Sequence, residues 1–425
     1  MRESEPTGPP LMKSPQKGKA MQILHECCCG LDVHKKSITA CVLRLGQEKQ
    51  IRRFGTTTWE IQSLSEWLQE AGCTHVAMES TGVYWKPVYN ILEGQFQLLV
   101  VNAQHLKAVP GRKTDVRDAE WIAELLQHGL LKGSFVPPEF ERQMRELTRY
   151  RTSLAKERAR TSQRLQKLLE SANIKLASVA SDIQGVSAYA ILRELAKGET
   201  DPAILASLAK GRLRHKRAEL EQALEGRVRA HHRFLIAELL GHLDYLEDSI
   251  ERLDQEIGDR FRPFEQDLQL ADTIPGINTR TAEVVLSEMG TDLSRFPSDA
   301  HLASWSGLCP GNNESAGKRR SGKTRKGNRW LRQALIEAAH GAAHTKETYL
   351  AARYRRIAAR RGHQKAAVAL AHTILIIVYH VLKRRRPYQD LGSNYFDERD
   401  KTAVQRRLVK RLEKLGFSVQ LEPAA

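Results

Sequence analysis

The sequence lacks most of what a secreted, disulfide-stabilised or membrane-spanning protein would need. Only 6 of its 425 residues are cysteine, and three of these are adjacent at 27–29, so they cannot form a disulfide framework. No cysteine spacing matches a zinc site, and we expect reduced, mostly buried thiols in a cytoplasmic protein. The best apolar stretch, 366–382, is interrupted by His372 and His380, so the sequence predicts no membrane-spanning helix.

Acidic residues are few compared with basic ones. Asp and Glu together number 50 against 67 Lys and Arg, which gives a formal charge of +17. So large an excess favours a polyanionic partner, either nucleic acid or an anionic membrane surface, over a merely solvated basic face. The start of the chain carries several prolines among mixed charges, and we expect residues 1–24 to form a disordered leader, with no signal peptide.

Residues 25–138 show the pattern of an α/β domain with a mixed sheet. Short apolar or alternating runs predict strands, and apolar residues at helical spacing predict the helices between them. The expected strands are 26–33, 37–45, 51–56, 74–79 and 97–101, and the expected helices are 58–71, 83–92 and one that starts after residue 110. Strands and helices in this order build an α/β layer.

Four acids stand where such a domain would place a site. Asp32 and Glu79 end two of the expected strands, and open α/β sheets bind their ligands at that edge. Asp115 and Asp118 lie three residues apart at the start of the next helix and share one of its faces. First-turn acids also serve simply to complement the helix dipole. Four gathered carboxylates would repel one another unless cations bind, and oxygen-only ligands select Mg²⁺ or Mn²⁺.

Four segments around these acids resemble the DEDD transposases of bacterial insertion sequences. They are Gly30-Leu-Asp-Val-His-Lys35, Met78-Glu-Ser-Thr-Gly-Val-Tyr-Trp85, Val101-Asn-Ala-Gln-His105 and Arg112-Lys-Thr-Asp-Val-Arg-Asp-Ala119. The resemblance implies a RuvC-like (RNase H-like) domain in which the four acids are catalytic and hold Mg²⁺. In the last segment we expect Lys113 and Arg117 to contact nucleic acid.

Residues 139–265 are predicted to form a helical region that includes a coiled-coil pattern. From Ile236 to Ile257 the apolar residues step by three and four in alternation, which is the seam of a coiled coil. The seam indicates either a helical hairpin within one chain or a coiled-coil arm that also joins two copies. The stretch before it, about 171–230, is basic and helix-prone, with turn signals at three glycines.

The segment Ile274-Pro-Gly-Ile-Asn278 looks like the turn of a helix-hairpin-helix element. Such a turn offers backbone N–H groups to a DNA phosphate at a helix N-terminus. Asn278 stands in place of the usual second glycine, and asparagine tolerates a left-handed backbone better than most residues, so we expect the turn to form. A plain helical turn explains the same residues equally well.

The most basic stretch of the second half, 307–330, is rich in Gly, Ser and Asn, which predicts a loop. Basic side chains on such a loop suit a phosphate backbone, although a solvated basic loop has the same composition. The cations that we expect to bind nucleic acid are Lys318, Arg319, Arg320, Lys323, Arg325, Lys326 and Arg329. A serine is a poor nucleophile without a base, a metal or strongly positive surroundings, so composition alone does not single out Ser315.

The resemblance does single out this serine. Residues 310–318, 326–332 and 337–339 look like the C-terminal transposase domain of the same family, whose serine attacks DNA and becomes transiently joined to it. By that match Ser315 is the catalytic serine. We expect this mainly α domain to span 266–390, with a tail helix in 391–425.

The resemblance also implies a function. The protein would be a transposase that cuts and rejoins donor and target DNA, guided by an element-encoded RNA, as a dimer or tetramer in the bacterial cytoplasm and without a membrane partner. One alternative is a metal-dependent junction nuclease in which water replaces Ser315 as nucleophile. Another is a non-catalytic nucleic-acid-binding protein, and four intact acids count against it.

Overall fold

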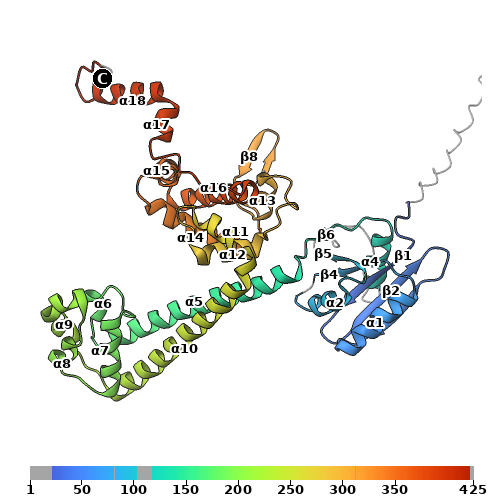
Figure 1. Ribbon diagram of the computed structural model, residues 1–425, viewed down its shortest axis with the longest axis horizontal. Coiled ribbons are helices and arrows are strands. Elements are labelled where there is room, and N and C mark those ends of the chain that lie inside the picture. The colour runs from blue at the N-terminus through green and yellow to red at the C-terminus, as the bar shows by residue number, and fades with distance from the viewer. Residues whose placement is uncertain (1–21, 81, 103–116, 312, 422–425) are drawn as a thin grey trace, which may run out of the picture. The chain divides into compact units, whose positions relative to one another are not determined.

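The computed structural model describes residues 22–80, 82–102, 117–311 and 313–421. The chain divides into two compact units, Met1–Val136 and Pro137–Ala425 (Figure 1). The predicted leader, apart from its last residues, lies outside the described part of the chain. The finer division at residues 265 and 390 stays a prediction.

The first unit contains a six-stranded mixed sheet with the strand order β3-β2-β1-β4-β5-β6. Strand β4 pairs in parallel with β1 and with β5, and the other neighbouring pairs are antiparallel. The strands are β1 (Cys27–Val33), β2 (Ile38–Arg44), β3 (Gln50–Phe54), β4 (His75–Glu79), β5 (Gln97–Val101) and β6 (Gly133–Ser134). The predicted mixed sheet is therefore confirmed, and the two-residue strand β6 is an addition that its sequence did not indicate.

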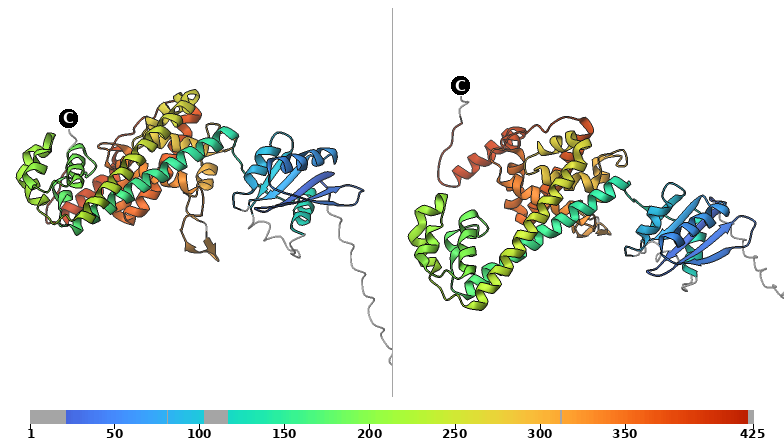
Figure 2. Two further views of the ribbon diagram at one scale, coloured as in Figure 1. Left: turned by 90° about the horizontal axis from the view of Figure 1, so that it is seen from below. Right: turned by 60° about the horizontal axis from the view of Figure 1, so that its bottom comes forward.

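Helices cover both faces of this sheet (Figures 1 and 2). Helices α1 (Thr58–Glu70) and α2 (Trp85–Leu92) pack on one face, over a core that includes Ile38, Leu64 and Met78. Helix α4 (Arg117–Gln127) packs on the other face, where Ala77 contacts its apolar side. All six cysteines lie among the described residues and are free thiols, four of them buried, as predicted.

The second unit is mostly helical and begins with a long helical pair. Helices α5 (Glu139–Ser171) and α10 (Ala230–Phe261) run antiparallel, since Arg151 pairs with Asp254 and Arg158 with Glu247. Leu154, Leu246 and Ile250 form part of the buried seam between them. The apolar pattern thus produces a helical pair within one chain, and its role in joining two copies stays a prediction.

Short helices close the end of this pair, as the glycine signals predicted. They are α6 (Leu176–Val179), α7 (Val186–Lys197), α8 (Pro202–Ser207), the 3-10 helix η1 (Gly211–Lys216) and α9 (Arg217–Leu224). Gly198 ends α7 in a left-handed conformation with φ of 117°, which a glycine adopts without the steric cost that a Cβ would add. Ile191, Leu195 and Leu220 pack with Ile236 of α10 in a common core.

The remaining helices of the second unit form a separate core around α16 (His363–Arg384). They are the 3-10 helix η2 (Arg262–Phe264), α11 (Glu265–Asp272), α12 (Thr279–Met289), α13 (Asp299–Trp305), α14 (Arg329–His344) and α15 (Tyr349–Arg361). Two tail helices, α17 (Tyr395–Arg399) and α18 (Lys401–Glu413), follow.

Helix α16 qualifies the prediction of no membrane-spanning segment. By length and composition it could cross a membrane, because His372 and His380 do not outweigh its aliphatic residues. However, Leu370, Ile374 and Val378 are fully buried in the core of the unit. Its apolarity is therefore explained by its central place among the neighbouring helices.

Candidate functional site

Asp32 and Glu79 lie side by side at the carboxyl ends of two neighbouring strands. Strands β1 and β4 are parallel neighbours with Leu31 opposite Met78, and each acid is the next residue of its strand. Because side chains alternate along a strand, the two acids point to the face opposite that of Leu31 and Met78. Leu31 and Met78 face α1 and α2, so both acids lie on the face that α4 covers.

Gly30 brings α4 onto this face and places Asp118 near Asp32. Gly30 and Asp32 share a face of β1, and a Cβ on Gly30 would lie only 2.2 Å from the carbonyl oxygen of Ala119 and 2.4 Å from the backbone nitrogen of Ala123. The helix can approach this closely only because the strand residue has no side chain. Asp118 precedes Ala119 in the chain and therefore begins α4 beside the strand end that carries Asp32.

The pKa of Asp32 responds to the charges of the other two described acids. Burial raises the pKa of Asp32, His34 opposes that rise, and the negative charges of Asp118 and Glu79 add to it. His34 Nε2 lies 3.0 Å from Asp32 Oδ2, and the His34 side chain is 64% exposed. His34 is a site neighbour that sequence analysis did not single out, although its place two residues after Asp32 was visible.

This arrangement fits a divalent cation by charge and by donor type. Burial is the main cause of the raised pKa of Asp32, and a cation would relieve the repulsion by Asp118 and Glu79 that adds to it. Carboxylate oxygens are the ligands that Mg²⁺ and Mn²⁺ prefer. Among the described residues, no three Asp, Glu, His or Cys side chains lie close enough together to hold a metal ion. Asp115, the fourth predicted ligand, lies outside the described residues, as does Lys113, and the side chain of Arg117 is not described.

Ser315 lies in a β-hairpin, so the prediction of a loop over 307–330 was partly wrong. Strand β7 (Asn313–Ser315) pairs with β8 (Lys318–Ser321), with Ser315 opposite Lys318. The two turn residues have positive φ, 51° at Ala316 and 72° at Gly317, the pattern of a type I′ turn. Glycine and serine content indicated a loop, but the two-residue turn allows the flanking residues to pair. The side chain of Ser315 is not among those described.

The predicted basic residues lie in the second strand of this hairpin and in the segment after it, and the hairpin projects from the helices of its unit (Figure 1). Lys318 is exposed in β8, and Lys323, Arg325 and Lys326 are exposed after it. Arg329 is the first residue of α14 and is also exposed. Arg319 and Arg320 lie in β8, although their side chains are not described. Ser315 therefore stands at the tip of a strongly basic segment, in a different unit from the acids.

A turn forms between α11 and α12, as both interpretations of this segment predicted, but Asn278 plays another part than expected. The backbone of Asn278 is extended, with φ of −113°, and its Oδ1 accepts a hydrogen bond from Thr281 N at 2.9 Å. It is thus the N-cap of α12, which removes the need for a left-handed residue there. Gly276 takes the left-handed position, at φ of 89°, and lies directly against the backbone of α14. The asparagine side chain therefore accepts the hydrogen bond from the Thr281 backbone N–H, which would otherwise be available to a phosphate.

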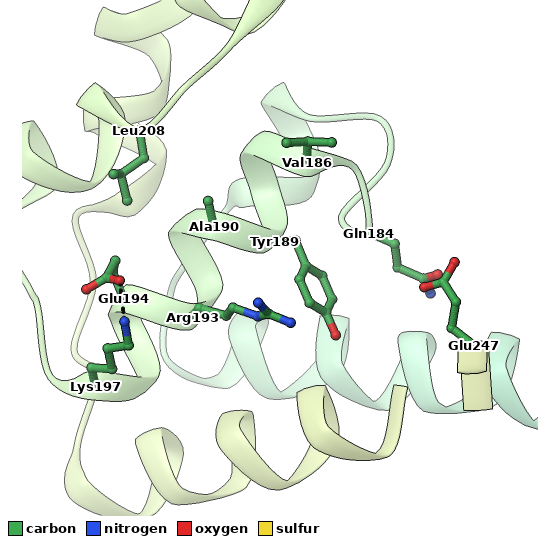
Figure 3. Close-up of a pocket in the computed structure, with 9 residues that line it drawn as sticks. All are labelled: Gln184, Val186, Tyr189, Ala190, Arg193, Glu194, Lys197, Leu208 and Glu247. Atoms are coloured by element: carbon green, nitrogen blue, oxygen red, sulfur yellow. Dashed lines mark hydrogen bonds and ion pairs between the residues drawn. The ribbon is translucent and has the colours of Figure 1, made fainter. Parts of the chain in front are cut away.

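A separate cavity of about 530 Å³ lies beside α7 and contains none of the predicted site residues (Figure 3). Tyr189 points towards α10, where its hydroxyl donates to Asp244 Oδ1 at 2.6 Å. Arg193 lies over the Tyr189 ring and pairs with Asp244, so the main polar groups of the cavity satisfy one another.

Two transposase family profiles match the chain, one over the predicted acids and one over the hairpin. A family profile of transposases, of the DEDD type found in IS110, matches residues 29–174, which include all four predicted acids. The profile described as the Transposase IS116/IS110/IS902 family matches residues 268–355, which include the hairpin with Ser315.

Two curated sequences are similar to the chain. The transposase for insertion sequence element IS1111A of Coxiella burnetii is 26% identical over 331 residues, which are 75% of this chain and 80% of that protein. The insertion element IS110 uncharacterized 43.6 kDa protein of Streptomyces coelicolor is 32% identical over 113 residues, 26% of this chain and 27% of that protein. With family matches on both the acid-bearing sheet and the serine-bearing hairpin, the chain belongs to the IS110 family of insertion-sequence transposases.

Proposed function

We propose that this transposase cuts and rejoins donor and target DNA with the acids of its first unit and Ser315 of its second. The observation that carries the proposal is that Asp32, Glu79 and Asp118 bring their charges to one face of the sheet, where burial and the charges of Asp118 and Glu79 raise the pKa of Asp32. Such a convergence of charge costs folding free energy. That cost is offset when the acids bind cations, and bound cations in turn attract a polyanionic substrate.

Asp32, Glu79, Asp115 and Asp118 would together hold Mg²⁺ or Mn²⁺. When bound there, such cations would neutralise charge on a phosphodiester and favour attack by an oxygen nucleophile. The chain's own contribution is to fix the carboxylates: Asp32 and Glu79 on adjacent parallel strands, and Asp118 on a helix held to Gly30. His34 accompanies Asp32 at the exposed side of the site.

Ser315 would act as the nucleophile, from the same subunit or another. Its Oγ forms a bond to phosphorus, the bond from phosphorus to one deoxyribose oxygen breaks, and the serine proton passes to the departing oxygen. The phosphoserine link keeps the bond energy, so a DNA hydroxyl can later reverse the step without ATP. Lys318, opposite Ser315 across the hairpin, would favour the added negative charge of the attacked phosphate.

The basic hairpin would bind the phosphate backbone of nucleic acid. Lys318, Lys323 and Lys326 are exposed and suit phosphates of any sequence. Sequence choice would come from an element-encoded RNA that pairs with donor and target DNA, the division of labour used by guided nucleases. Strand exchange needs two or more protomers, and we expect a dimer or tetramer.

A metal-dependent nuclease without a covalent intermediate is the runner-up. The observation that favours it is that the acids are gathered in one unit, while Ser315 lies in the other. In that case water would attack the phosphate, and Ser315→Ala would still cut DNA. A binding-only protein would bind DNA without cutting it, and substitution of the acids or of Ser315 would leave that binding unchanged.

The acid site is tested by comparing two first-turn substitutions on α4. Asp118→Asn should lower Mg²⁺-dependent DNA cleavage by about 100-fold or more, because one cation ligand is lost. Glu120→Gln is the matched control: Glu120 lies on the same turn but pairs with Lys49, so cleavage should stay near the native rate. Equal cleavage by the two variants, with native DNA binding, would reject the acid site.

A further inference from the structure

A fully buried carboxylate links the long helix α5 to the end of the serine hairpin. Glu288, in the last turn of α12, is 0% exposed. Its Oε1 accepts from Arg149 Nε at 2.7 Å, and its Oε2 accepts from Arg149 Nη2 at 2.8 Å. The Oε2 atom also accepts from Asn328 Nδ2 at 2.6 Å. Three elements therefore meet at one carboxylate, and one of them is the segment that follows the hairpin.

Helix α5 holds the end of α12 with a stripe of side chains one helical turn apart. Glu141, Arg145 and Arg149 lie at successive i, i+4 positions. Arg145 Nε donates to the Ser287 carbonyl at 3.0 Å, and Glu141 accepts from Arg295 Nη1 at 3.1 Å. A cation on the last carbonyls of a helix also complements its dipole. We call the contacts of Glu141, Arg145 and Arg149 the clamp. It starts within two helical turns of Pro137, where the second unit begins.

Asn328 connects the clamp to the hairpin. Its Oδ1 caps α14 by accepting from Trp330 N at 3.0 Å and Leu331 N at 3.2 Å, while its Nδ2 is the group that reaches Glu288. One side chain therefore fixes both the start of α14 and the end of the chain segment returning from Ser315.

The two sides of the hairpin are joined at the same place. Arg332 Nη1 donates to the Gly307 carbonyl at 2.9 Å and to Thr324 Oγ1 at 2.7 Å. Gly307 and Gly327 approach so closely that a Cβ on Gly327 would lie 2.4 Å from Gly307 N. Whatever holds Asn328 and Arg332 therefore sets the position of the whole hairpin relative to the helices.

We propose that Glu288 is a positioning residue for Ser315, acting through Asn328 to hold the hairpin at a fixed place on α5 and α12. The inference rests on the proposed role of Ser315 as nucleophile. Glu288 does not touch DNA. It transmits the placement of α5, the first helix after the unit boundary, to the hairpin that carries the nucleophile.

Stability alone does not account for this carboxylate. Replacing a buried ion pair with apolar residues of similar volume is often neutral or stabilising, whereas removing one partner is costly. A second buried carboxylate of the same helix, Glu283, is 2% exposed and pairs with Arg280 at 2.8 Å. Glu283 is bonded to Arg280 and Ser287 and not to the residues at the base of the hairpin, so it provides a matched comparison for Glu288.

The experiment separates the cap from the anchor in the full-length protein. Asn328→Ser keeps an N-cap oxygen for α14, because serine is as good an N-cap as asparagine, but removes the amide that donates to Glu288. With labelled junction DNA, the element's RNA and Mg²⁺, the variant should melt near the native temperature and bind DNA with native Kd. Its rate of forming the Ser315–DNA adduct should fall about 10- to 100-fold, as expected for a displaced nucleophile.

Hydrogen exchange supplies a second readout that does not depend on chemistry. In Asn328→Ser and Glu288→Gln the backbone amides of 313–324 should exchange faster than in the native protein. Glu283→Gln should lower the melting temperature while keeping hairpin exchange and the adduct rate per folded molecule. Native adduct rate and hairpin exchange in Asn328→Ser, or equal slowing by Glu283→Gln and Glu288→Gln, would overturn the proposal. If the native protein forms no adduct at Ser315, the proposed function fails, and hairpin exchange still decides whether Glu288 anchors the hairpin.

Discussion

The acid-bearing edge of the first unit and the serine hairpin of the second unit are built in opposite ways. Asp32 and Glu79 lie on adjacent central strands, and Asp118 lies on a helix that contacts the sheet through Gly30. Ser315 lies next to a two-residue turn that projects from its helices and is held at its base. Cation ligands need fixed mutual geometry, whereas a nucleophile must reach a phosphate on a large substrate. The comparison indicates that rigidity at the serine is concentrated at the base of the hairpin.

The largest expected effect comes from filling the contact between β1 and α4. Gly30→Ala should displace α4, because its Cβ would lie 2.2 Å from a backbone oxygen. We expect the free energy of unfolding to fall by about 1–3 kcal/mol and metal-dependent cleavage to fall about 100-fold through misplaced acids. Urea unfolding and a cleavage assay measure the two effects.

A control for that substitution is available in the same unit. Gly46 has φ of 76° and nothing within 4 Å of its Cβ position, so Gly46→Ala should cost only about 1–2 kcal/mol of backbone strain and leave cleavage intact. If Gly30→Ala cut DNA as well as Gly46→Ala does, the close approach of α4 would not be what assembles the acids.

The second prediction concerns the charge of Asp32 without metal. The pKa of Asp32 is raised in the folded protein, so ionisation of this side chain lowers the free energy of unfolding at neutral pH. This penalty shrinks as the pH falls through the raised pKa and is gone below the ordinary pKa of an aspartate. Asp32→Asn should therefore raise the melting temperature in metal-free neutral buffer. It should also abolish the increase in melting temperature that we expect Mg²⁺ to give the native protein. A melting temperature that still rises with Mg²⁺ in this variant would place the cation elsewhere.

The turn of the hairpin gives a smaller, two-sided prediction. Ala316 has φ of 51°, a left-handed conformation that costs an alanine about 1–2 kcal/mol, so Ala316→Gly should stabilise the hairpin by about that amount, less the glycine's chain entropy. Gly317→Ala should act in the opposite direction, since φ there is 72°. Exchange of the hairpin amides measures both, and identical exchange in the two variants would argue against the type I′ turn.

The smallest expected effect is on DNA affinity. Lys323→Gln removes one exposed cation after β8, which should weaken binding to all sequences alike and reduce the salt dependence of log K by about one unit of slope. Lys197, which pairs with Glu194 at 2.7 Å, provides a surface control in Lys197→Gln. A loss of affinity confined to one DNA sequence would show that Lys323 reads bases instead.

The sequence was a good guide to the acid edge because the pattern there is local. Strand periodicity placed Asp32 and Glu79 at strand ends, and the glycine two residues before Asp32 was visible as Gly30-Leu-Asp. That Gly30 faces α4 depends on pairing between strands far apart in the chain, which no local pattern contains. His34 is exposed beside Asp32 and has no period that would distinguish it from any surface histidine.

The serine segment was harder to predict because its structure depends on contacts across the fold. Its composition indicates a loop, and pairing of Ser315 with Lys318 depends on an alanine adopting a conformation that alanine rarely adopts. No sequence pattern indicated the role of Glu288, since an acid in an amphipathic helix usually faces water. In the structure Glu288 is fully buried, and its partners lie about 140 and 40 positions away in the chain.

The most direct test of the proposed function is denaturing-gel detection of a protein–DNA adduct with end-labelled donor and target DNA, the element's RNA and Mg²⁺. We predict an adduct that maps to Ser315, persists in Ser321→Ala, and is absent in Ser315→Ala and Asp118→Asn. Ser321 is the matched control because it lies in the same hairpin and its hydroxyl accepts from Lys323 N at 3.1 Å. Cleaved DNA without any adduct, or an adduct that survives Ser315→Ala, would contradict the serine mechanism.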